Sequence, residues 1–391
     1  MTPAPLKLGF MPLVDAAPLI IAAEMGFAEE EGLRLSLEAS PSWSALRDKL
    51  SFGHLDAAHM LSPVPVASAL GLGGGGGALD ALSVLSVNGN VIGVSPMLAK
   101  SMRAAGHDFA FNDARAAGKA LIAAKPQGLR IGVPFPFSMH AELVYYWLSA
   151  LGFHAPQDMI VRTVPPPLMA DAMEAGEIDA FCVGEPWGSR SVDAGVGELL
   201  LPGSAVWSFA PEKVLAVRAG WAEDQRDTAL RLIRALGRAG RGVSEPSSQV
   251  LAPEIMAQSR YLELPAELLE RALRGQFVIS PRGEVRNVEG FVNFFQGAAG
   301  FPWRSQAEWI GTQLAARTGL DRETVGKAAR ATFRSDLYRE ALAGVAHDLP
   351  SASAKLEGAV AEPTVVGSMG GRLILPGDAF FDGRIFEPSG G

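Results

Sequence analysis

The fold prediction starts from two short stretches, Gly53-His54-Leu55-Asp56-Ala57 and Gly176-Glu177-Ile178-Asp179-Ala180. Both have the form G-x-[LI]-D-A, and each leads a predicted strand into a helix start that contains proline. A repeat this short counts for little alone, because a helix, a glycine and a strand often follow one another in proteins. Since the surroundings of the two stretches are also alike, the pattern suggests two lobes built on the same plan.

Apolar runs alternate with amphipathic segments around the first stretch. We expect strands at residues 6–10, 33–38, 56–60 and 82–87. We expect helices at residues 18–25, from the N-cap Ser42 through Leu50, and from Pro63 onward. Strands that alternate with helices of about ten residues imply right-handed βαβ units and a mainly parallel sheet.

The second stretch lies in a region with the same alternation. This region contains predicted strands at 129–133, 160–164 and 178–183, and a helix from Ser138 to about Leu151. After a strand at 213–218 the chain becomes strongly helical, at 226–241, 266–273 and 305–318. The tail, 359–391, is rich in Gly and Pro and predicts an irregular path over the surface. The glycine run 73–77 is not followed by Gly-Lys-Ser/Thr, so we interpret it as a flexible surface loop and not as a P-loop.

Composition excludes several classes of protein. The chain has 391 residues, 48% of them hydrophobic, which is enough for two or three domains with sizeable cores. The net charge of −8 gives no support to a nucleic-acid surface, and it would repel an anion at long range. No run of about 18 apolar residues predicts a membrane span. An anion site must therefore depend on local donors, such as helix N-termini and one or two cations.

Residues with catalytic chemistry are sparse. Cys182 is the only cysteine, so neither an intramolecular disulfide nor a cysteine-based zinc site can form. It lies at the end of a predicted apolar strand, where a buried structural thiol is a more ordinary role than a nucleophile. No G-x-S-x-G occurs, and metal-ligand spacing is absent among His54, His59, His107, His140, His154 and His347. We therefore expect no enzymatic activity, no metal and no cofactor.

Two predicted strand-to-helix turns leave backbone N–H groups free at the start of a helix. One is Ser138-Met139-His140, and the other is Gly184-Glu185-Pro186-Trp187. A helix N-terminus has unpaired donors and about half a positive charge, which favours a bound anion. A neutral His140 could donate one N–H to a ligand, although a surface histidine beside a helix cap fits the residues equally well.

Trp43 and Lys213 are the other candidate anion contacts. Trp43 follows the predicted N-cap Ser42, and its indole offers one donor beside a large apolar face, which suits a weakly hydrated planar anion. A core tryptophan is the alternative. Lys213 begins a predicted strand after a Pro-Glu turn, and on the residues alone it is a solvated lysine.

Eight motifs occur in a fixed order along most of the chain: Pro41-Ser42-Trp43, Arg47-Asp48-Lys49-Leu50, Val87-Asn88-Gly89-Asn90, 135–147 with His140, Cys182-Val183-Gly184-Glu185-Pro186-Trp187, Pro211-Glu212-Lys213, Phe301-Pro302-Trp303-Arg304-Ser305-Gln306 and Phe380-Phe381-Asp382-Gly383. In this order they resemble the nitrate and bicarbonate solute-binding proteins of ABC transporters, the NrtA and CmpA types. The resemblance implies a type II periplasmic-binding-protein fold, an α/β fold of two lobes with mixed, mostly parallel sheets and a ligand cleft between them. It places 1–92 and 213–391 in lobe I and 93–212 in lobe II.

The resemblance also implies the residues of the cleft: Trp43, Asn90, His140, Gly184 and Lys213. Trp43 and Asn90 would donate hydrogen bonds from one lobe, and His140 and the Gly184 N–H from the other. Lys213 would supply the positive charge. The family's nitrate binders carry Gln at the position of Asn90. Because the Asn side chain is one methylene shorter, we expect either a changed pocket geometry or a water between Asn90 and the ligand.

A lining made only of donors fits nitrate or nitrite better than bicarbonate, because bicarbonate also has an O–H group to donate. Glu185 is the nearby acceptor that would weaken this argument if it faced the ligand instead of capping its helix.

The chain runs from Met1 straight into the first predicted strand, without the basic, apolar and small-residue regions of a signal peptide. In this respect it resembles the cytoplasmic nitrate/nitrite sensors of the NasS type. Those sensors hold an RNA-binding antitermination regulator of the NasT type and release it when ligand binds, which controls nitrate assimilation genes. We therefore expect a cytoplasmic sensor with such a partner and no direct contact with nucleic acid or membrane. The alternatives are the substrate-binding component of a nitrate/nitrite or bicarbonate ABC transporter, and an enzyme similar to the thiamine-pyrimidine synthases.

Overall fold

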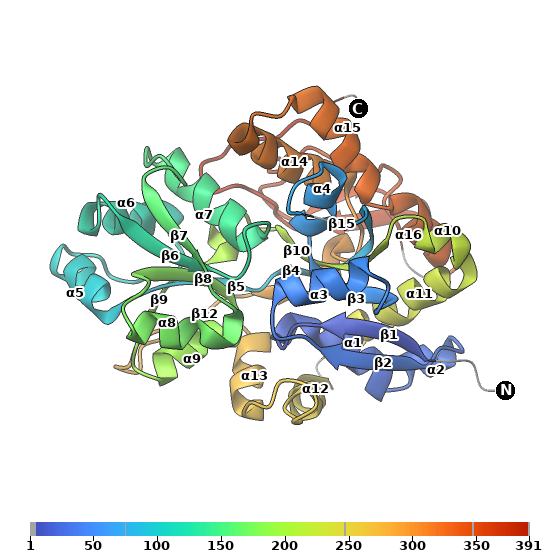
Figure 1. Ribbon diagram of the computed structural model, residues 1–391, viewed down its shortest axis with the longest axis horizontal. Coiled ribbons are helices and arrows are strands. Elements are labelled where there is room, and N and C mark those ends of the chain that lie inside the picture. Colours follow the sequence, from blue (N-terminus) through green and yellow to red (C-terminus); the bar gives the residue numbers. More distant parts are fainter. Residues whose placement is uncertain (1–4, 75, 246–247, 346–347, 390–391) are drawn as a thin grey trace.

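The computed structural model describes residues 5–74, 76–245, 248–345 and 348–389, which form two α/β lobes (Figure 1). Each lobe is built around its own sheet, one of six strands and one of five. In Figure 1 the six-stranded lobe lies on the right and the five-stranded lobe, in cyan and green, on the left. The two lobes expected from the sequence are therefore confirmed.

The six-stranded sheet of lobe I has the order β13-β4-β10-β3-β1-β2. Strand β1 pairs in parallel with β2 and β3, whereas β10 runs antiparallel to β3 and β4. The central strands β3 and β10 are buried along almost their whole length, in keeping with their apolar sequences. The strands are β1 (Leu6–Phe10), β2 (Leu35–Ala39), β3 (Ala57–Leu61), β4 (Leu79–Asn88), β10 (Pro211–Arg218) and β13 (Val292–Asn293).

The five-stranded sheet of lobe II has the order β7-β6-β8-β5-β9. Strand β6 pairs in parallel with β7 and β8, and β5 runs antiparallel to β8 and β9. The strands are β5 (Asn90–Val94), β6 (Leu129–Val133), β7 (Met159–Thr163), β8 (Ala180–Gly184) and β9 (Glu198–Pro202).

Helices surround both sheets, and serine side chains cap the two helices that carry Trp43 and His140. Ser42 Oγ accepts from the Ala45 N–H at 3.2 Å, and Ser138 Oγ accepts from the Ala141 N–H at 3.2 Å. Lobe I contains α1 (Ala17–Glu24), α2 (Phe27–Glu30), α3 (Trp43–Ser51), α4 (Pro63–Ala69), α10 (Trp221–Asp224), α11 (Arg226–Val243), α12 (Ser248–Met256), α13 (Ala266–Leu273), α14 (Arg304–Thr318), α15 (Arg322–Thr332) and α16 (Ser335–Leu342). Lobe II contains α5 (Pro96–Ala104), α6 (Ala114–Ala124), α7 (Met139–Ala150), α8 (Met169–Glu174) and α9 (Trp187–Asp193). The described ranges also contain the short 3-10 helices η1 (Val14–Ala16), η2 (Pro166–Leu168), η3 (Gly203–Ala205) and η4 (Gln296–Ala298).

The chain crosses between the lobes at Gly89, which separates β4 from β5, and again between β9 and β10. Gly89 has a φ of 102°, a conformation that residues with a side chain rarely adopt. Strands β5 and β10, which follow the two crossings, are antiparallel to their neighbours in each sheet. The sheets therefore contain more antiparallel pairing than the sequence suggested. The first crossing lies a little before the expected lobe boundary at residues 92 and 93, and the lobe bounds stay a prediction.

The C-terminal part of the chain is mainly helical, with two small antiparallel sheets added to it. One joins β11 (Gln276–Val278) to β12 (Val285–Asn287), and the other joins β14 (Thr364–Gly367) to β15 (Arg372–Leu375). The first returns to lobe II, where the Leu199 N–H donates to the Ile279 carbonyl at 2.8 Å. The tail, expected to be irregular, therefore contains a hairpin.

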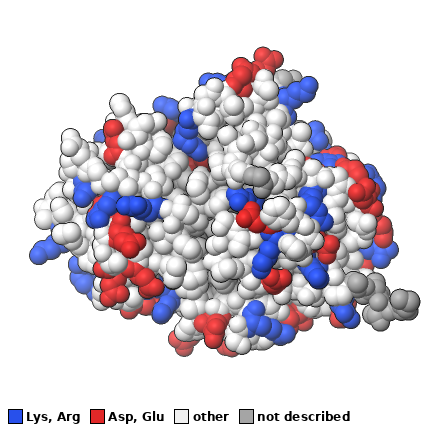
Figure 2. All heavy atoms as spheres, viewed as in Figure 1, with Lys and Arg blue, Asp and Glu red and all other residues white. Residues whose placement is uncertain are grey.

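The surface carries charges of both signs. On the face in Figure 2, Lys and Arg side chains are interspersed with Asp and Glu, so that face presents no continuous basic surface. Among the helices within the described ranges, no helix combines the length and the apolar composition that crossing a membrane requires.

Candidate ligand-binding site

The five expected site residues come together where the two lobes meet. Trp43 is the first residue of α3, and Lys213 lies in β10. Asn90 begins β5 and pairs in register with Gly184, the last residue of β8, while His140 is the second residue of α7. The side chains of Trp43, Asn90, His140 and Lys213 are at most 1% exposed, so the site is enclosed.

The ammonium group of Lys213 is held by two carboxylates. Its Nζ lies 2.8 Å from Oδ2 of Asp15 and 2.9 Å from Oε1 of Glu212. It also lies 5.7 Å from the centre of the Trp43 ring, within cation–π range. Burial lowers the pKa of Lys213, but the two carboxylates raise it further, so the side chain is charged. The solvated lysine suggested by the residues alone is wrong, since the side chain is fully buried.

Glu212 already engages two of the groups that were assigned to a ligand, Asn90 and Lys213. Its Oε2 accepts from Nδ2 of Asn90 at 2.5 Å, and its Oε1 lies 3.3 Å from Nδ1 of His140. Burial raises the pKa of Glu212 to about 7, although Lys213 opposes the rise. This carboxyl group therefore changes its charge close to neutral pH.

Two buried histidines and an aspartate complete the cluster. Nε2 of His59, from β3, lies 3.0 Å from Oδ1 of Asp15, which belongs to η1. Burial lowers the pKa of both histidines, and that of His140 falls well below its usual value because Lys213 adds to the effect. Burial raises the pKa of Asp15, but Lys213 and His59 hold it well below its usual range. At neutral pH the site therefore contains neutral histidines and an ionised Asp15.

Several buried polar atoms here have no hydrogen-bond partner among the described residues, including Trp43 Nε1, Asn90 Oδ1 and His140 Nε2. The last two face Gly184, since each lies 3.7 Å from the position of a Cβ built on that glycine. An unpaired buried polar group costs about 1–3 kcal/mol. Gathered in one enclosed place, such groups could be satisfied by a small polar ligand or by water.

Contacts between the lobes enclose the site. The Val14 N–H donates to the Glu185 carbonyl at 3.0 Å, and Trp187 Nε1 donates to the Pro12 carbonyl at 2.8 Å. Both bonds join the loop after β1 in lobe I to the turn after β8 in lobe II. They hold the strand end that carries Gly184 against the segment that carries Asp15.

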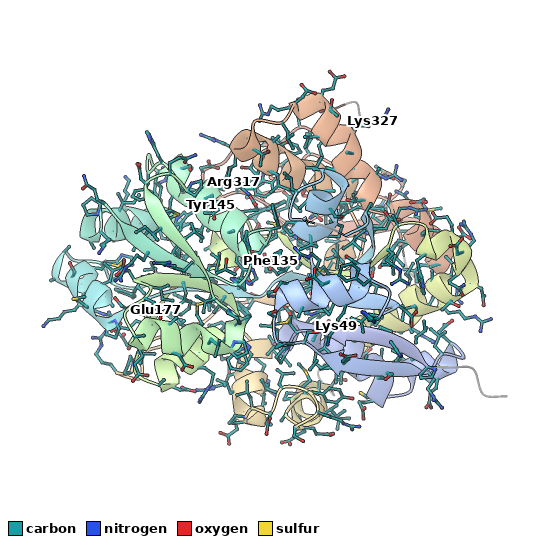
Figure 3. All side chains as sticks on the ribbon, in the orientation of Figure 1. Lys49, Phe135, Tyr145, Glu177, Arg317 and Lys327 are labelled. Atoms are coloured by element: carbon teal, nitrogen blue, oxygen red, sulfur yellow. The ribbon has the colours of Figure 1, made fainter. Side chains whose placement is uncertain are left out.

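Two further contacts join the lobes beside the site. The guanidinium of Arg47 lies 5.7 Å from the ring centre of Phe135, which Figure 3 places at the junction. Arg317 of α14 forms an ion pair with the fully buried Glu142 of α7, and its guanidinium lies 4.9 Å from the Tyr145 ring (Figure 3). The first half of α7, which carries His140, and the loop before it are therefore both in contact with lobe I.

The structure corrects the expected lining in two respects. The lining is not made only of donors, because Asp15 and Glu212 bring carboxylates to it. Asn90 lies on lobe II with His140 and Gly184, and not with Trp43, because the chain has already crossed at Gly89. Glu185 is not an acceptor in this lining. Its carboxylate accepts from the Ser189 N–H of α9 at 3.2 Å.

Sequence reasoning missed Asp15, His59 and Glu212. Successive residues of a regular strand point to opposite faces, so a glutamate next to Lys213 was not expected in the same site. The pairing of β10 with β4 shifts register between Pro211 and Lys213, and such a bulge re-aims side chains locally. The sequence contained even less indication that Asp15 and His59 belong to the site, since both are isolated polar residues in apolar runs.

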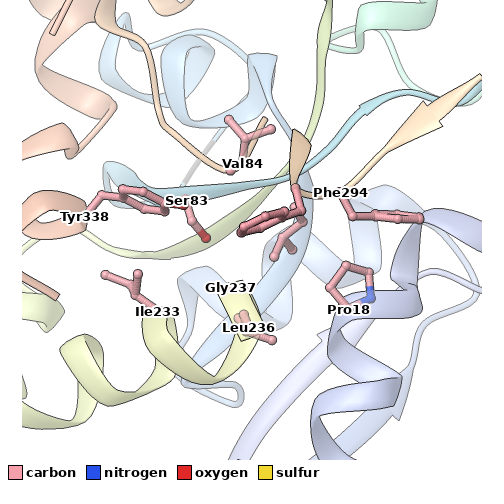
Figure 4. A pocket seen from close by; sticks show the side chains of 11 residues that line it. Pro18, Ser83, Val84, Ile233, Leu236, Gly237, Phe294 and Tyr338 are labelled. Carbon is pink, nitrogen blue, oxygen red and sulfur yellow. The ribbon is translucent and has the colours of Figure 1, made fainter. Parts of the chain in front are cut away.

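A second site could form at Cys182, among metal-ligating side chains or in a separate cavity. Burial raises the pKa of the Cys182 thiol well above its usual value, with Glu212 adding to the rise, which opposes a nucleophilic role. No cluster of three metal-ligating side chains is found in the part of the chain that the structure describes, and His347 lies outside that part. A small cavity between β4, α1 and α11 is lined by residues such as Pro18, Ser83 and Tyr338 and shares none with the site (Figure 4).

Comparisons with known proteins agree with this architecture. Residues 1–257 match the model of the NMT1-like family. The nitrate/nitrite binding protein NrtA of Synechococcus elongatus is 30% identical over 98% of this chain and 83% of its own length. The bicarbonate-binding protein CmpA of Synechococcus is 27% identical over 98% of this chain and 84% of its own length. The crystal structure of the periplasmic nitrate-binding protein NrtA from Synechocystis superposes with a TM-score of 0.83 at 26% identity, covering 98% of this chain and 95% of that one.

A further relative is longer. The nitrate import ATP-binding protein NrtC of Synechocystis is 32% identical over 79% of this chain. The matched part covers only 45% of the length of NrtC. Two α/β lobes that meet at a small polar site are the architecture of the periplasmic-binding-protein fold. The chain belongs to the NMT1-like family, within the group of NrtA- and CmpA-like ABC-transporter solute-binding proteins.

Proposed function

We propose that this protein binds nitrate or nitrite in the enclosed site and is the substrate-binding component of an ABC transporter for that anion. The observation that carries the proposal is the fully buried ammonium group of Lys213, beside the unpartnered donors of Trp43 and His140. A cation and aimed N–H groups in a site shielded from water favour a small anion. The similarity to NrtA proteins and to the ATP-binding import protein NrtC supports the choice of anion and of transport, and we expect no catalysis.

Bicarbonate is the second candidate ligand. The carboxylates of Asp15 and Glu212 give the site acceptors that the O–H group of bicarbonate could use, whereas nitrate has no proton to donate. The similarity to CmpA also favours this candidate. We rank nitrate and nitrite first because both carboxylates are already engaged by Lys213.

Isothermal titration calorimetry with nitrate, nitrite, bicarbonate and chloride tests this proposal. We expect a micromolar dissociation constant for nitrate or nitrite, about −8 kcal/mol, and no binding of chloride. Binding of bicarbonate alone would replace the ligand, and failure of all four anions would overturn the function.

The cytoplasmic sensor that the sequence suggested stays a prediction, and the relatives favour transport over it. The two roles differ in their partners. A sensor would retain an antitermination regulator in a pull-down and release it when nitrate is added, because ligand and regulator would bind antagonistically. A transport component would instead bind a membrane transporter, and it would stimulate that transporter's ATPase when loaded with nitrate.

A further inference from the structure

The enclosed site contains two carboxyl groups, Asp15 and Glu212, beside a single cation, Lys213. At neutral pH Lys213 contributes one positive charge and Asp15 one negative charge, while His59 and His140 are neutral. If Glu212 is ionised, the empty site has a net charge of minus one, and a monovalent anion would make it minus two. A second uncompensated negative charge is strongly unfavourable in an enclosed site, because screening by water is weak there.

Glu212 also competes with a ligand for the same hydrogen-bond donors. Its two oxygens take the amide N–H of Asn90 and one position on Lys213 Nζ, and they approach Nδ1 of His140. In its ionised form this carboxylate is an internal anion that occupies part of the lining. A neutral carboxylic acid would hold those donors less strongly and would add an O–H donor of its own.

We propose that Glu212 is protonated in the anion-bound site and donates this O–H toward the bound anion, so that each nitrate binds together with one proton. Nitrate is the base of a strong acid and brings no proton of its own at neutral pH. The proton therefore passes from solvent to a carboxylate oxygen of Glu212, and no covalent bond other than this O–H forms. The inference rests on the proposed function and adds a determinant of affinity and specificity to it.

The neighbouring titratable groups are less suited to accept this proton. His140 lies on α7 beside Lys213, and His59 lies on β3 near Lys213, so burial and the nearby cation both oppose a second positive charge. Asp15 is kept ionised by Lys213 and His59. The thiol of Cys182, on β8, is already neutral. The raised pKa of Glu212, about 7, agrees with its role as the acceptor.

Calorimetry of nitrate binding between pH 6 and 9, in buffers with different protonation enthalpies, tests the proposal. Above pH 7 we expect uptake of about one proton per nitrate and a dissociation constant that rises roughly tenfold per pH unit. Below pH 6 both effects should fade, because Glu212 is then protonated before nitrate binds. Nitrate binding with no proton uptake across this range would overturn the inference and leave the proposed function intact. Absence of nitrate binding at every pH would instead overturn the proposed function.

Two variants test whether Glu212 is the residue that takes up the proton. Glu212→Gln should abolish both the proton uptake and the pH dependence of the remaining binding. The matched control is Glu185→Gln, since Glu185 is equally buried with a pKa also raised to about 7, but its carboxylate faces Ser189 within lobe II. This control should keep the proton uptake. Uptake that persists in Glu212→Gln would contradict the assignment.

Infrared difference spectra of the unaltered protein provide a readout that does not depend on how the variants fold. At pH 8, addition of nitrate should produce a new carboxylic-acid C=O band. A spectrum without this band would overturn the inference.

Discussion

The Nζ of Lys213 lies 2.8 Å from Oδ2 of Asp15, and both side chains are at most 1% exposed. Asp15 follows β1 and Lys213 lies in β10, so the pair joins the start of the chain to the second crossing between the lobes. Desolvation of two charges makes such a pair a modest source of stability, but removal of either partner leaves a buried charge unpaired. The pair therefore fixes the cation where the lobes meet.

Lys213→Met should abolish nitrate binding and lower the free energy of unfolding by about 3–5 kcal/mol, because it leaves Asp15 and Glu212 without their cation. Urea denaturation and calorimetry measure the two effects. The double variant Lys213→Met/Asp15→Asn should recover part of the stability and none of the binding. Nitrate affinity that survives Lys213→Met would show that the charge assignment is wrong.

Trp43→Phe should weaken nitrate binding by about ten- to a hundredfold, the range expected for one hydrogen bond to a charged group. Nε1 has no partner among the described residues, but phenylalanine is smaller than the buried indole, so the cavity should also lower the free energy of unfolding by about 1–3 kcal/mol. Trp207→Phe is the matched control, because Nε1 of Trp207 is likewise buried with no partner in the described ranges, whereas its ring stacks on Phe380 outside the site. Equal loss of affinity in both variants would contradict a specific role for Trp43.

Gly184→Ala should reduce nitrate binding severely while the protein still folds. The new Cβ would lie 3.0 Å from Leu13 Cδ2, so that side chain must shift by a few tenths of an ångström. It would also fill the space between Asn90 and His140. Gly237→Ala, in α11 with nothing within 4 Å of its Cβ, should leave binding unchanged and raise stability by about 0.5–1 kcal/mol. Unchanged affinity in Gly184→Ala would place the anion elsewhere.

Serine caps and apolar periodicity predicted the helix starts well. The ends of α3 and α7 that carry Trp43 and His140 follow Ser42 and Ser138, because a cap acts within a few residues of sequence. The resemblance to a known family supplied the five lining positions, which the structure brings together. Asp15 and Glu212 could not be foreseen, since their place in the site depends on tertiary packing and on an irregularity in β10. The lobe of Asn90 was missed because a crossing at a single glycine leaves little periodic signal.

Glu142→Gln should lower the free energy of unfolding by about 3 kcal/mol and weaken nitrate binding, because it leaves Arg317 without its carboxylate. Burial raises the pKa of Glu142, and the nearby Arg317 opposes this rise. The charged form of the Glu142 carboxylate is therefore stabilised by its ion pair with Arg317. A double-mutant cycle with Arg317→Met measures the coupling between the two lobes. A coupling energy near zero would mean that the pair does not hold α7 to α14.

Glu185→Gln should stabilise the protein at pH 8 by about 3 kcal/mol and have almost no effect near pH 4. Burial raises the folded-state pKa of Glu185 to about 7 from an ordinary value of 4.5. Because the folded pKa is the higher one, the wild-type carboxyl group favours the folded state fully below pH 4.5, and this contribution is lost as pH rises toward 7. Denaturation of both proteins at pH 4 and pH 8 measures the difference, and equal stabilities at pH 8 would contradict it.

The account depends most on where the anion binds, and a crystal structure of the protein with nitrate tests that directly. We expect one nitrate between the lobes, within hydrogen-bond distance of Trp43 Nε1, Lys213 Nζ and His140. A nitrate bound outside this cluster, or a nitrate-free cluster in protein that calorimetry shows to be saturated, would contradict the account.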